Sequence, residues 1–260
     1  MRRLGELTWR EAEALKARAP VVLVPIGSTE AHGPHLPLAT DAILSEELAE
    51  RAAATLDGAG YATLVAPTVA YAITHYASEF AGTISIAPST ATALVADVCS
   101  SLIAQGFARV CLVNSHLEPA HVASLKEACA RVLAERGVAV VFADQLEKRW
   151  ARTLTDEFKR GACHAGSYET SLVLAARPEL VRDEVRRQLM VKPIDLARAM
   201  REGKRTFGEA GASEAYFGDP AAASVEEGND IYARLVAMVV EEVQAAWPLA
   251  TGAAPSASSS

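Results

Sequence analysis

Short apolar runs recur along the chain, each bounded by polar residues, proline or glycine, and the clearest is VVLVPI at 21–26. Runs of this length that do not alternate with polar residues are typical of strands covered on both faces of a sheet. We therefore predict buried strands at 21–26, 61–66, 108–114 and 138–143.

The segments between these strands carry apolar residues at helical spacing. We predict helices at 43–56, 91–105 and 120–135. Gly58, Gly106 and Gly137 lie just beyond their ends, where glycine commonly terminates a helix. Because strands and helices alternate, the pattern predicts an α/β fold with a mainly parallel sheet.

Both ends of the chain add helices. Thr8, with Glu11 three residues later, has the pattern of a capping box that opens a short helix. Residues 183–224 are charged and interrupted by Gly and Pro, which indicates an excursion over the active face or an interface. We expect a single domain over 1–250 and a disordered tail at 251–260. Further helices are predicted at 147–158, 170–176 and 223–246.

The composition narrows the classes of function. Apolar residues make up 50% of the 260 and charged residues 22%, the profile of a soluble globular protein with a large core. A net charge of −7 without a basic block argues against nucleic acid and membranes as partners. The sequence contains no signal-like or membrane-spanning run, and Cys99, Cys111 and Cys129 resemble buried reduced thiols. A cytoplasmic location is therefore expected.

A loop rich in metal-binding side chains follows the first predicted strand. Glu30, His32, His35 and Asp41 fall within the segment 27–41, and imidazole and carboxylate groups bind divalent ions. Glu30 and His32 are two residues apart, so they point to the same side of an extended segment. A solvated polar loop is the alternative, and for an isolated loop of this kind it is the more common case.

Other polar clusters follow the later strands. His116 and Glu118 come directly after the strand at 108–114 and repeat the spacing of two residues. Because ligands bind beyond the carboxyl ends of parallel strands, these clusters should meet at one edge of the sheet. Two imidazoles and three carboxylates are enough for two divalent ions with one bridging carboxylate. The expected metal ligands are Glu30, His32, Asp41, His116 and Glu118.

Several motifs together resemble the creatininase (creatinine amidohydrolase) family. The string GSTEAHGPHLPLATD at 27–41 resembles the family signature. Further matches, in the family's order, are GELTW at 5–9, FAGTISI at 80–86, NSHLEP at 114–119 and CHAGSYETS at 163–171. The resemblance implies a three-layer α/β/α fold that is usually assembled as a homohexamer.

The resemblance also assigns roles to residues. It implies that Glu30 and His116 bind one metal, that His32 and Glu118 bind the other, and that Asp41 bridges both. His164 corresponds to the catalytic histidine, and Glu118 is expected to take part in catalysis as well as in metal binding. Many relatives have glycine in place of Glu118, so the chain sides with creatininase proper at this position. The expected ions are Zn²⁺, with Mn²⁺ or Fe²⁺ as alternatives.

The implied reaction is hydrolysis of an amide C–N bond. Two cations would lower the pKa of a bridging water, and one would polarise the substrate carbonyl. His164 would protonate the leaving nitrogen, although it could instead only hydrogen-bond to a metal ligand. A small amide or cyclic amide is the expected substrate. The alternatives are creatinine itself, a formamide, a cofactor-precursor peptide, or a silent family member that serves as a scaffold.

The chain departs from creatininase near the expected pocket. Cys163 stands where creatininase has glutamate, Leu117 replaces an aromatic residue, and Gln145 lies where a tryptophan is expected. We therefore expect a wider pocket and weak or no activity on creatinine. Cys163 is best interpreted as a packing replacement, with a soft metal ligand or a reactive thiol as alternatives.

The remaining candidates have open roles. Glu169 is expected to hydrogen-bond to a metal ligand or to bind metal itself, in competition with Glu118. His75 lies in the loop expected beside the substrate, but a surface histidine is equally common. His35 is expected to hold its loop by hydrogen bonds, and His121 to be structural.

Overall fold

A four-stranded parallel sheet lies at the centre of the computed structural model, which describes residues 2–161 and 164–249. The strand order is β2 (Thr63–Val65), β1 (Val21–Ile26), β3 (Arg109–Asn114) and β4 (Val141–Ala143). In the register of the central pair, Ile26 lies opposite Asn114. The loops that leave β1 and β3 therefore begin side by side at the carboxyl edge of the sheet.

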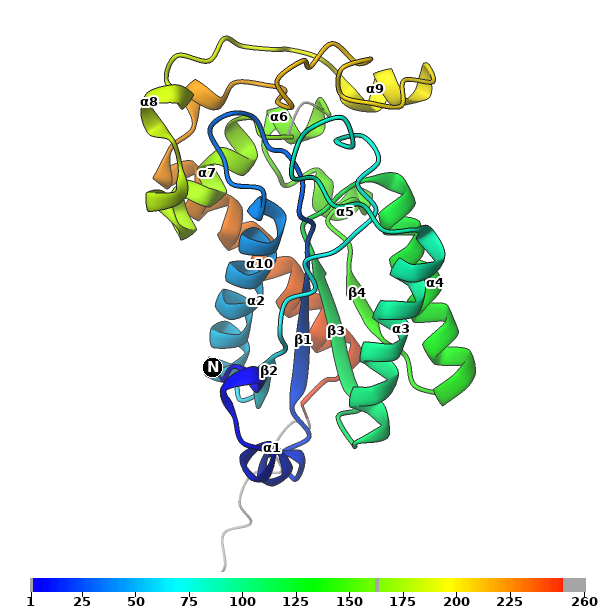
Figure 1. Ribbon diagram of the computed structural model, residues 1–260. Helices are drawn as coiled ribbons and strands as arrows, with labels where there is room; N and C mark the ends of the chain where they lie inside the picture. The colour runs from blue at the N-terminus through cyan, green and yellow to red at the C-terminus, as the bar shows by residue number, and fades with distance from the viewer. Residues whose placement is uncertain (1, 162–163, 250–260) are drawn as a thin grey trace, which may run out of the picture.

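Helices cover both faces of the sheet and give three layers (Figure 1). One face carries α2 (Thr40–Gly58), α7 (Ser167–Ala176) and α10 (Val225–Ala246), which contact one another. The opposite face carries α3 (Pro88–Ala104) and α4 (Pro119–Arg136). The predicted three-layer α/β/α fold with a parallel sheet is confirmed.

Strand β1 connects the two halves of the core because its side chains alternate between the faces. Val21 and Leu23 pack with the α2, α7 and α10 layer, whereas Val22, Val24 and Ile26 pack with the α3 and α4 layer. All five are buried. Each fully buried apolar side chain of this size contributes about 1.5–3 kcal/mol, which is why the run carries no polar side chain.

Most predicted elements are present with shifted ends. The helices α2, α3 and α4 begin earlier than predicted, and the last two open with a proline, whose fixed φ suits the first helical turn. The prediction of a single helix at 147–158 was wrong, because two short helices lie there. The first helix, α5 (Lys148–Ala151), ends well before Thr155. Thr155 is extended, and its side chain accepts the backbone N–H of Phe158 as the N-cap of α6 (Asp156–Lys159).

The short elements complete the chain. Thr8 and Glu11 form the predicted capping box of α1 (Trp9–Lys16), which lies at the amino end of the strands. The segment 183–224 passes over the carboxyl edge of the sheet (Figure 1), which confirms the predicted excursion over this face. The other elements are η1 (Leu4–Glu6), η2 (Pro178–Leu180), α8 (Asp183–Arg186), α9 (Leu196–Arg201) and η3 (Pro220–Ala222).

Two further expectations can be compared with the structure. Cys99 and Cys111 are buried free thiols, as predicted, whereas Cys129 is a free thiol that is only half-buried. None of the described helices has both the length and the apolar character needed to cross a bilayer. The expected disordered tail at 251–260 and Cys163 lie outside the described residues, and the single domain stays a prediction.

Candidate metal centre and active site

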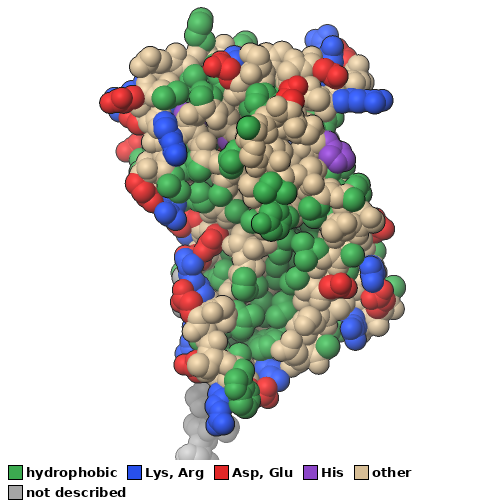
Figure 2. Space-filling model, viewed as in Figure 1, with side chains coloured by type: hydrophobic (Ala, Val, Ile, Leu, Met, Phe, Trp, Pro, Cys, Tyr) green, Lys and Arg blue, Asp and Glu red, His purple; other side chains and the backbone are tan. Residues whose placement is uncertain are grey.

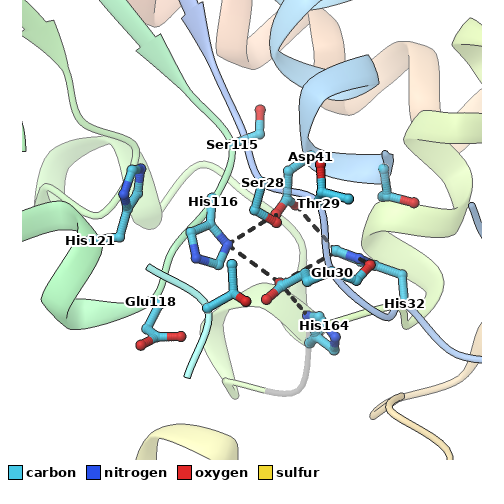
Figure 3. Close-up of polar contacts among 12 residues, drawn as sticks. Ser28, Thr29, Glu30, His32, Asp41, Ser115, His116, Glu118, His121 and His164 are labelled. Atoms are coloured by element: carbon cyan, nitrogen blue, oxygen red, sulfur yellow. Dashed lines mark hydrogen bonds and ion pairs between the residues drawn. The ribbon is translucent and has the colours of Figure 1, made fainter. Parts of the chain in front are cut away.

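Asp41 occupies the centre of a buried polar cluster beyond the carboxyl ends of β1 and β3 (Figure 3). It lies in the first turn of α2, and Gly27 lets the loop after β1 pass close by, because a Cβ there would clash with the backbone of Asp41 and Ala42. Asp41 Oδ1 is 3.2 Å from His32 Nε2, and Oδ2 is 3.0 Å from His116 Nδ1. One carboxylate thus faces two imidazoles through different oxygens.

Two sets of three potential ligands share Asp41. Glu30, Asp41 and His116 form the first set, and His32, Asp41 and Glu169 form the second. Within each set the ligand atoms lie within 4.8 Å of one another, and all of these residues are buried. Each set offers one imidazole and two carboxylates, a donor combination that suits zinc or manganese.

Glu118 is not in either set, in contrast to the pairing with His32 that the family resemblance implied. Glu118 is buried at the cavity wall, and its Oε2 accepts the backbone N–H of Tyr76 at 3.4 Å. Glu169 lies beside His32 instead, because α7 begins at Ser167, earlier than predicted, and places Glu169 in its first turn. Figure 3 shows Glu118 apart from the contacts that join the cluster. The motif at 163–171 includes Glu169, so the sequence did mark this residue as a candidate for the site.

Backbone carbonyls fix which nitrogen each histidine presents. His32 Nδ1 is 3.1 Å from the carbonyl of Glu30, and His116 Nε2 is 2.7 Å from the carbonyl of Ile73. A carbonyl can only accept a hydrogen bond, so each of these nitrogens carries the proton. The opposite nitrogens, His32 Nε2 and His116 Nδ1, are left facing the carboxylates, as is usual for metal ligands.

The electrostatics of the cluster fit bound cations. Although burial disfavours the charged ring, Asp41 and the other carboxylates raise the pKa of His32 to about 10. Burial raises the pKa of Glu169 to about 8. His32 Nε2 is buried and has no hydrogen-bond partner within the described part of the chain. A bound cation would displace the protons held by His32 and Glu169, and it would give His32 Nε2 the partner that it lacks among the described residues.

His164 lies against the cluster between two aromatic rings. Its ring centroid is 4.3 Å from that of His32 and 4.3 Å from that of Phe207. Nε2 donates to the carbonyl of Ala31 at 3.0 Å, which leaves Nδ1 facing Glu30 Oε1 at 3.8 Å. Burial, with a smaller effect of His32, lowers the pKa of His164 to about 4. Nδ1 is therefore a proton acceptor at neutral pH.

A cavity of about 70 Å³ opens over the cluster. His164, Glu118 and both ligand sets except His32 line it, together with the side chains of Tyr76, Leu117, Leu196, Met200 and Phe207. Apart from Leu117, which follows His116, these wall residues come from loops and from the excursion at 183–224. No sequence motif marked them.

The remaining candidates lie away from the cavity. His75 is exposed and does not line it, so the structure favours the surface interpretation. His35 Nε2 and Thr170 Oγ1 are 2.9 Å apart, which ties the loop to α7 as expected. His121 Nε2 contacts Asn114 Oδ1 at 3.2 Å, a structural contact as expected. Gln145 accepts the hydroxyl of Tyr168 at 2.9 Å and is not a wall residue, so its expected part in the pocket was wrong.

Known proteins resemble this chain over most of its length. The family model for creatinine amidohydrolase matches residues 5–243. The mycofactocin precursor peptide peptidase of Mycobacterium tuberculosis H37Rv is 33% identical over 247 residues, covering 92% of this chain and 91% of the relative. The creatinine amidohydrolase of Pseudomonas putida is 29% identical over 194 residues, covering 68% and 73%.

Solved structures show the same fold. A manganese creatininase superposes with a TM-score of 0.74 at 24% identity, covering 95% of this chain and 99% of that one. A mutant creatininase of Zn–Zn type gives 0.71 at 24% identity, covering 95% and 98%. The chain therefore belongs to the creatininase family, whose members are metal-dependent amidohydrolases or peptidases.

Proposed function

We propose that the protein hydrolyses the C–N bond of an amide with the help of two divalent cations. Glu30 and His116 would hold one cation, His32 and Glu169 would hold the other, and Asp41 would be shared. The observation that supports this most strongly is the pair of distances from Asp41, 3.2 Å from Oδ1 to His32 Nε2 and 3.0 Å from Oδ2 to His116 Nδ1.

Bound cations would supply Lewis acidity toward the substrate carbonyl and toward water, and Zn²⁺, Mn²⁺ or Fe²⁺ would suit these donors. The protein side chains then have to move one proton. His164 Nδ1 accepts it from the attacking water, because Nε2 is already committed to Ala31. The same proton passes to the leaving nitrogen, which must be protonated to depart.

Glu118 is the second acid–base candidate. It lines the cavity without belonging to either ligand set, and burial raises the pKa of its carboxyl. In this position it can orient the attacking water or exchange a proton with it. We therefore keep Glu118 in a catalytic role and assign the ligand role to Glu169.

The substrate is a small amide or cyclic amide in this proposal, because the cavity over the cluster is small. Trimming of a short peptide is the second candidate. Peptidases match this chain over nine-tenths of its length, with 33% identity for the M. tuberculosis enzyme, whereas the creatinine amidohydrolase matches over 68%. Both substrates present the same reacting group to the site.

The test combines metal analysis with an activity screen. Purified protein should contain two divalent ions per subunit by mass spectrometry, and the loaded enzyme should hydrolyse at least one class among small lactams, cyclic ureas, formamides and short peptides. Chelation should abolish the activity and metal should restore it. Protein without bound metal, or loaded protein inert toward all four classes, would instead support the scaffold alternative.

We also propose that the protein is cytoplasmic and assembles as a homohexamer. Light scattering on the purified protein measures the number of subunits.

A further inference from the structure

Hydrogen bonds fix only one side of the imidazole of His164. Its Nε2 donates to the carbonyl of Ala31 at 3.0 Å, and no other hydrogen bond reaches the ring from the described residues. Nδ1 is 3.8 Å from Glu30 Oε1, which is beyond hydrogen-bond distance. The direction of Nδ1, the nitrogen that the proposed proton transfer uses, therefore depends on how the ring is packed.

Two aromatic rings lie against this imidazole. The ring centroids of His32 and Phe207 are each 4.3 Å from that of His164, and the ring planes are tilted by 36° and 38°. An imidazole enclosed at this distance can turn only if a neighbour moves, because protein interiors are close-packed. His32 belongs to a ligand set, whereas Phe207 has no metal-binding atom, so Phe207 is the support that lies outside the metal site.

Phe207 is itself held in place. Its side chain is 3% exposed, its backbone N–H donates to the carbonyl of Tyr76 at 2.9 Å, and its carbonyl accepts the N–H of Ala212 at 2.8 Å. Its ring meets that of Phe217 edge-on, with centroids 5.3 Å apart. A side chain locked by packing in this way can orient a functional neighbour. The two phenylalanines belong to a small apolar cluster, whose buried members are Ala31, Ala77, Phe207, Ala212, Ala215 and Phe217.

The same cluster holds His164 at two further points. Ala31 supplies the carbonyl that accepts the Nε2 proton, and the backbone N–H of Phe217 donates to the carbonyl of His164 at 2.9 Å. His164 is 8% exposed. On the face that Figure 2 draws, one histidine stands out at the side of the end that carries the excursion, and only traces of others are visible.

We propose that Phe207 is a positioning residue for His164. Its ring keeps the imidazole turned so that Nε2 stays on the carbonyl of Ala31 and Nδ1 stays toward the cluster. In that direction Nδ1 takes the proton from the attacking water and passes it to the leaving nitrogen. Phe207 carries no proton and acts through the imidazole. The proposal rests on the proposed amide hydrolysis and adds to it a residue from the excursion at 183–224.

The test compares two changes at Phe207 with a matched change elsewhere. Phe207→Leu removes the ring and keeps an apolar side chain, whereas Phe207→Tyr keeps the ring. Phe107→Leu is the control, because Phe107 is 4% exposed and packs in the core on the α3 and α4 side of the sheet. Each protein is loaded with Zn²⁺, and the metal content should match wild type in all three variants.

The first measurement is nuclear magnetic resonance of protein labelled with ¹⁵N in its histidines, with His164→Ala to assign the signals. In wild type, Phe207→Tyr and Phe107→Leu, His164 should give one set of signals with the proton on Nε2. In Phe207→Leu the two ring nitrogens should become more alike, because a ring that turns exchanges its partners and populates both tautomers. This measurement needs no substrate.

The second measurement is turnover of the amide that is hydrolysed fastest among the four classes of the activity screen. Phe207→Leu should lower kcat by about 10–100-fold, the effect of a misplaced catalytic group, and change KM by less than about twofold. In a His164→Ala background the same substitution should change kcat by less than about twofold, because residues that act as a unit are not additive. A rise in KM in both backgrounds would show that Phe207 only contacts the substrate and would overturn the proposal.

Three other results would also overturn it: unchanged spectra in Phe207→Leu, the same spectral change in Phe107→Leu, or loss of metal in Phe207→Leu. The expected spectra from a protein that hydrolyses none of the four classes would support the positioning role and count against the proposed function. Hydrolysis together with unchanged spectra in Phe207→Leu would do the reverse.

Discussion

Glu169 Oε2 lies 3.5 Å from His32 Nε2, and this contact joins the first turn of α7 to the loop after β1. The same oxygen accepts the backbone N–H of Ala165 at 2.6 Å, which fixes the direction of the carboxylate. Ala165 has a φ of 50°, a left-handed conformation that L-residues rarely adopt. This backbone geometry brings His164 and Glu169 to the same side of the site.

The first prediction separates Glu169 from Glu118. Glu169→Ala should lose about one metal ion per subunit, because Glu169 belongs to a ligand set that shares Asp41. Glu118→Gln should keep both ions and lose turnover by about 10²–10⁴-fold, as expected for a group that moves or orients a proton. Mass spectrometry of the metal content decides between them. Loss of metal in Glu118→Gln with full content in Glu169→Ala would restore the ligand role to Glu118.

The second prediction concerns the shared carboxylate. Asp41→Ala should remove both ions, whereas Glu30→Ala should remove about one. The reason is that Asp41 meets the two imidazoles through different oxygens at 3.2 and 3.0 Å, whereas Glu30 approaches both only through Oε1, at 3.9 Å from His32 and 3.4 Å from His116. Ser28→Ala is the matched control, since Ser28 Oγ donates to Asp41 Oδ2 at 2.7 Å without belonging to either set. It should retain both ions. Equal losses in Asp41→Ala and Glu30→Ala would exclude a bridge.

The third prediction is that metal binding releases protons. In the metal-free protein the pKa is about 10 for His32 and about 8 for Glu169, so both are protonated at pH 7. The cation beside Glu169 requires neutral His32 and ionised Glu169, so its binding at pH 7 should release about two protons. The cation beside Glu30 should release one more from His116, because, although burial disfavours the charged ring, Glu30 and Asp41 raise the pKa of His116 well above its usual value. Affinity should therefore rise with pH up to about 8, where Glu169 is half ionised, and continue to rise toward 10.

Calorimetry in two buffers of different ionisation enthalpy measures this release. The control is Glu169→Gln, which has no proton to lose at this position and should release about one proton fewer. Binding without proton release at pH 7, or affinity that falls between pH 6 and 8, would contradict the pKa directions.

The fourth prediction concerns Glu157, which holds the segment that carries His164 and Glu169. Its Oε1 accepts the backbone N–H of Tyr168 at 2.9 Å, and its Oε2 accepts that of Asp219 at 2.9 Å. Glu157→Ala removes both of these acceptors and should lower the free energy of unfolding by about 1–3 kcal/mol. It should also weaken binding of the ion beside Glu169.

Glu147→Ala is the control for this change, because Glu147 is an exposed residue that pairs with Arg149 at the surface. A surface ion pair contributes about 0–1 kcal/mol, so both stability and metal affinity should stay near wild type. Urea unfolding and metal titration measure the two effects. Unchanged metal affinity in a destabilised Glu157→Ala protein would mean that Glu157 is structural only.

The sequence predicted those parts of the site that depend on strand ends. The apolar run at 21–26 predicted β1. Ile26 and Asn114 lie opposite each other at the ends of β1 and β3, and this pairing brings Glu30 and His116 together. The position of Glu169 beside His32, where Glu118 was expected, was not predictable in this way. It depends on the residue at which α7 begins, and Thr170, which looked like the start, instead bonds His35 from within the helix.

The cavity walls were equally hard to predict. Met200 and Phe207 reach the site from the segment 183–224, which has little regular structure and no motif. Contacts of this kind depend on tertiary packing and leave no periodic signal in the sequence. The start of a separate helix α6 has a local cause. The side chain of Thr155 caps the first turn of α6, and a hydrogen bond of this kind competes with a helix that would continue through Thr155.

The last prediction concerns Leu117, which lines both the cavity at the cluster and a neighbouring groove of about 420 Å³. We expect kcat/KM for creatinine well below ~10⁴ M⁻¹s⁻¹, because discrimination depends on wall contacts and this wall is aliphatic. Leu117→Trp should fill space on the side of the cavity that faces the groove and reduce hydrolysis of extended substrates more than hydrolysis of small amides. Metal content should stay unchanged, since Leu117 is not in either ligand set. Leu133→Trp, a change on the exposed side of α4 where Leu133 is 51% exposed, controls for the added ring. An equal loss for small and extended substrates would show that the groove is not on the path of the substrate.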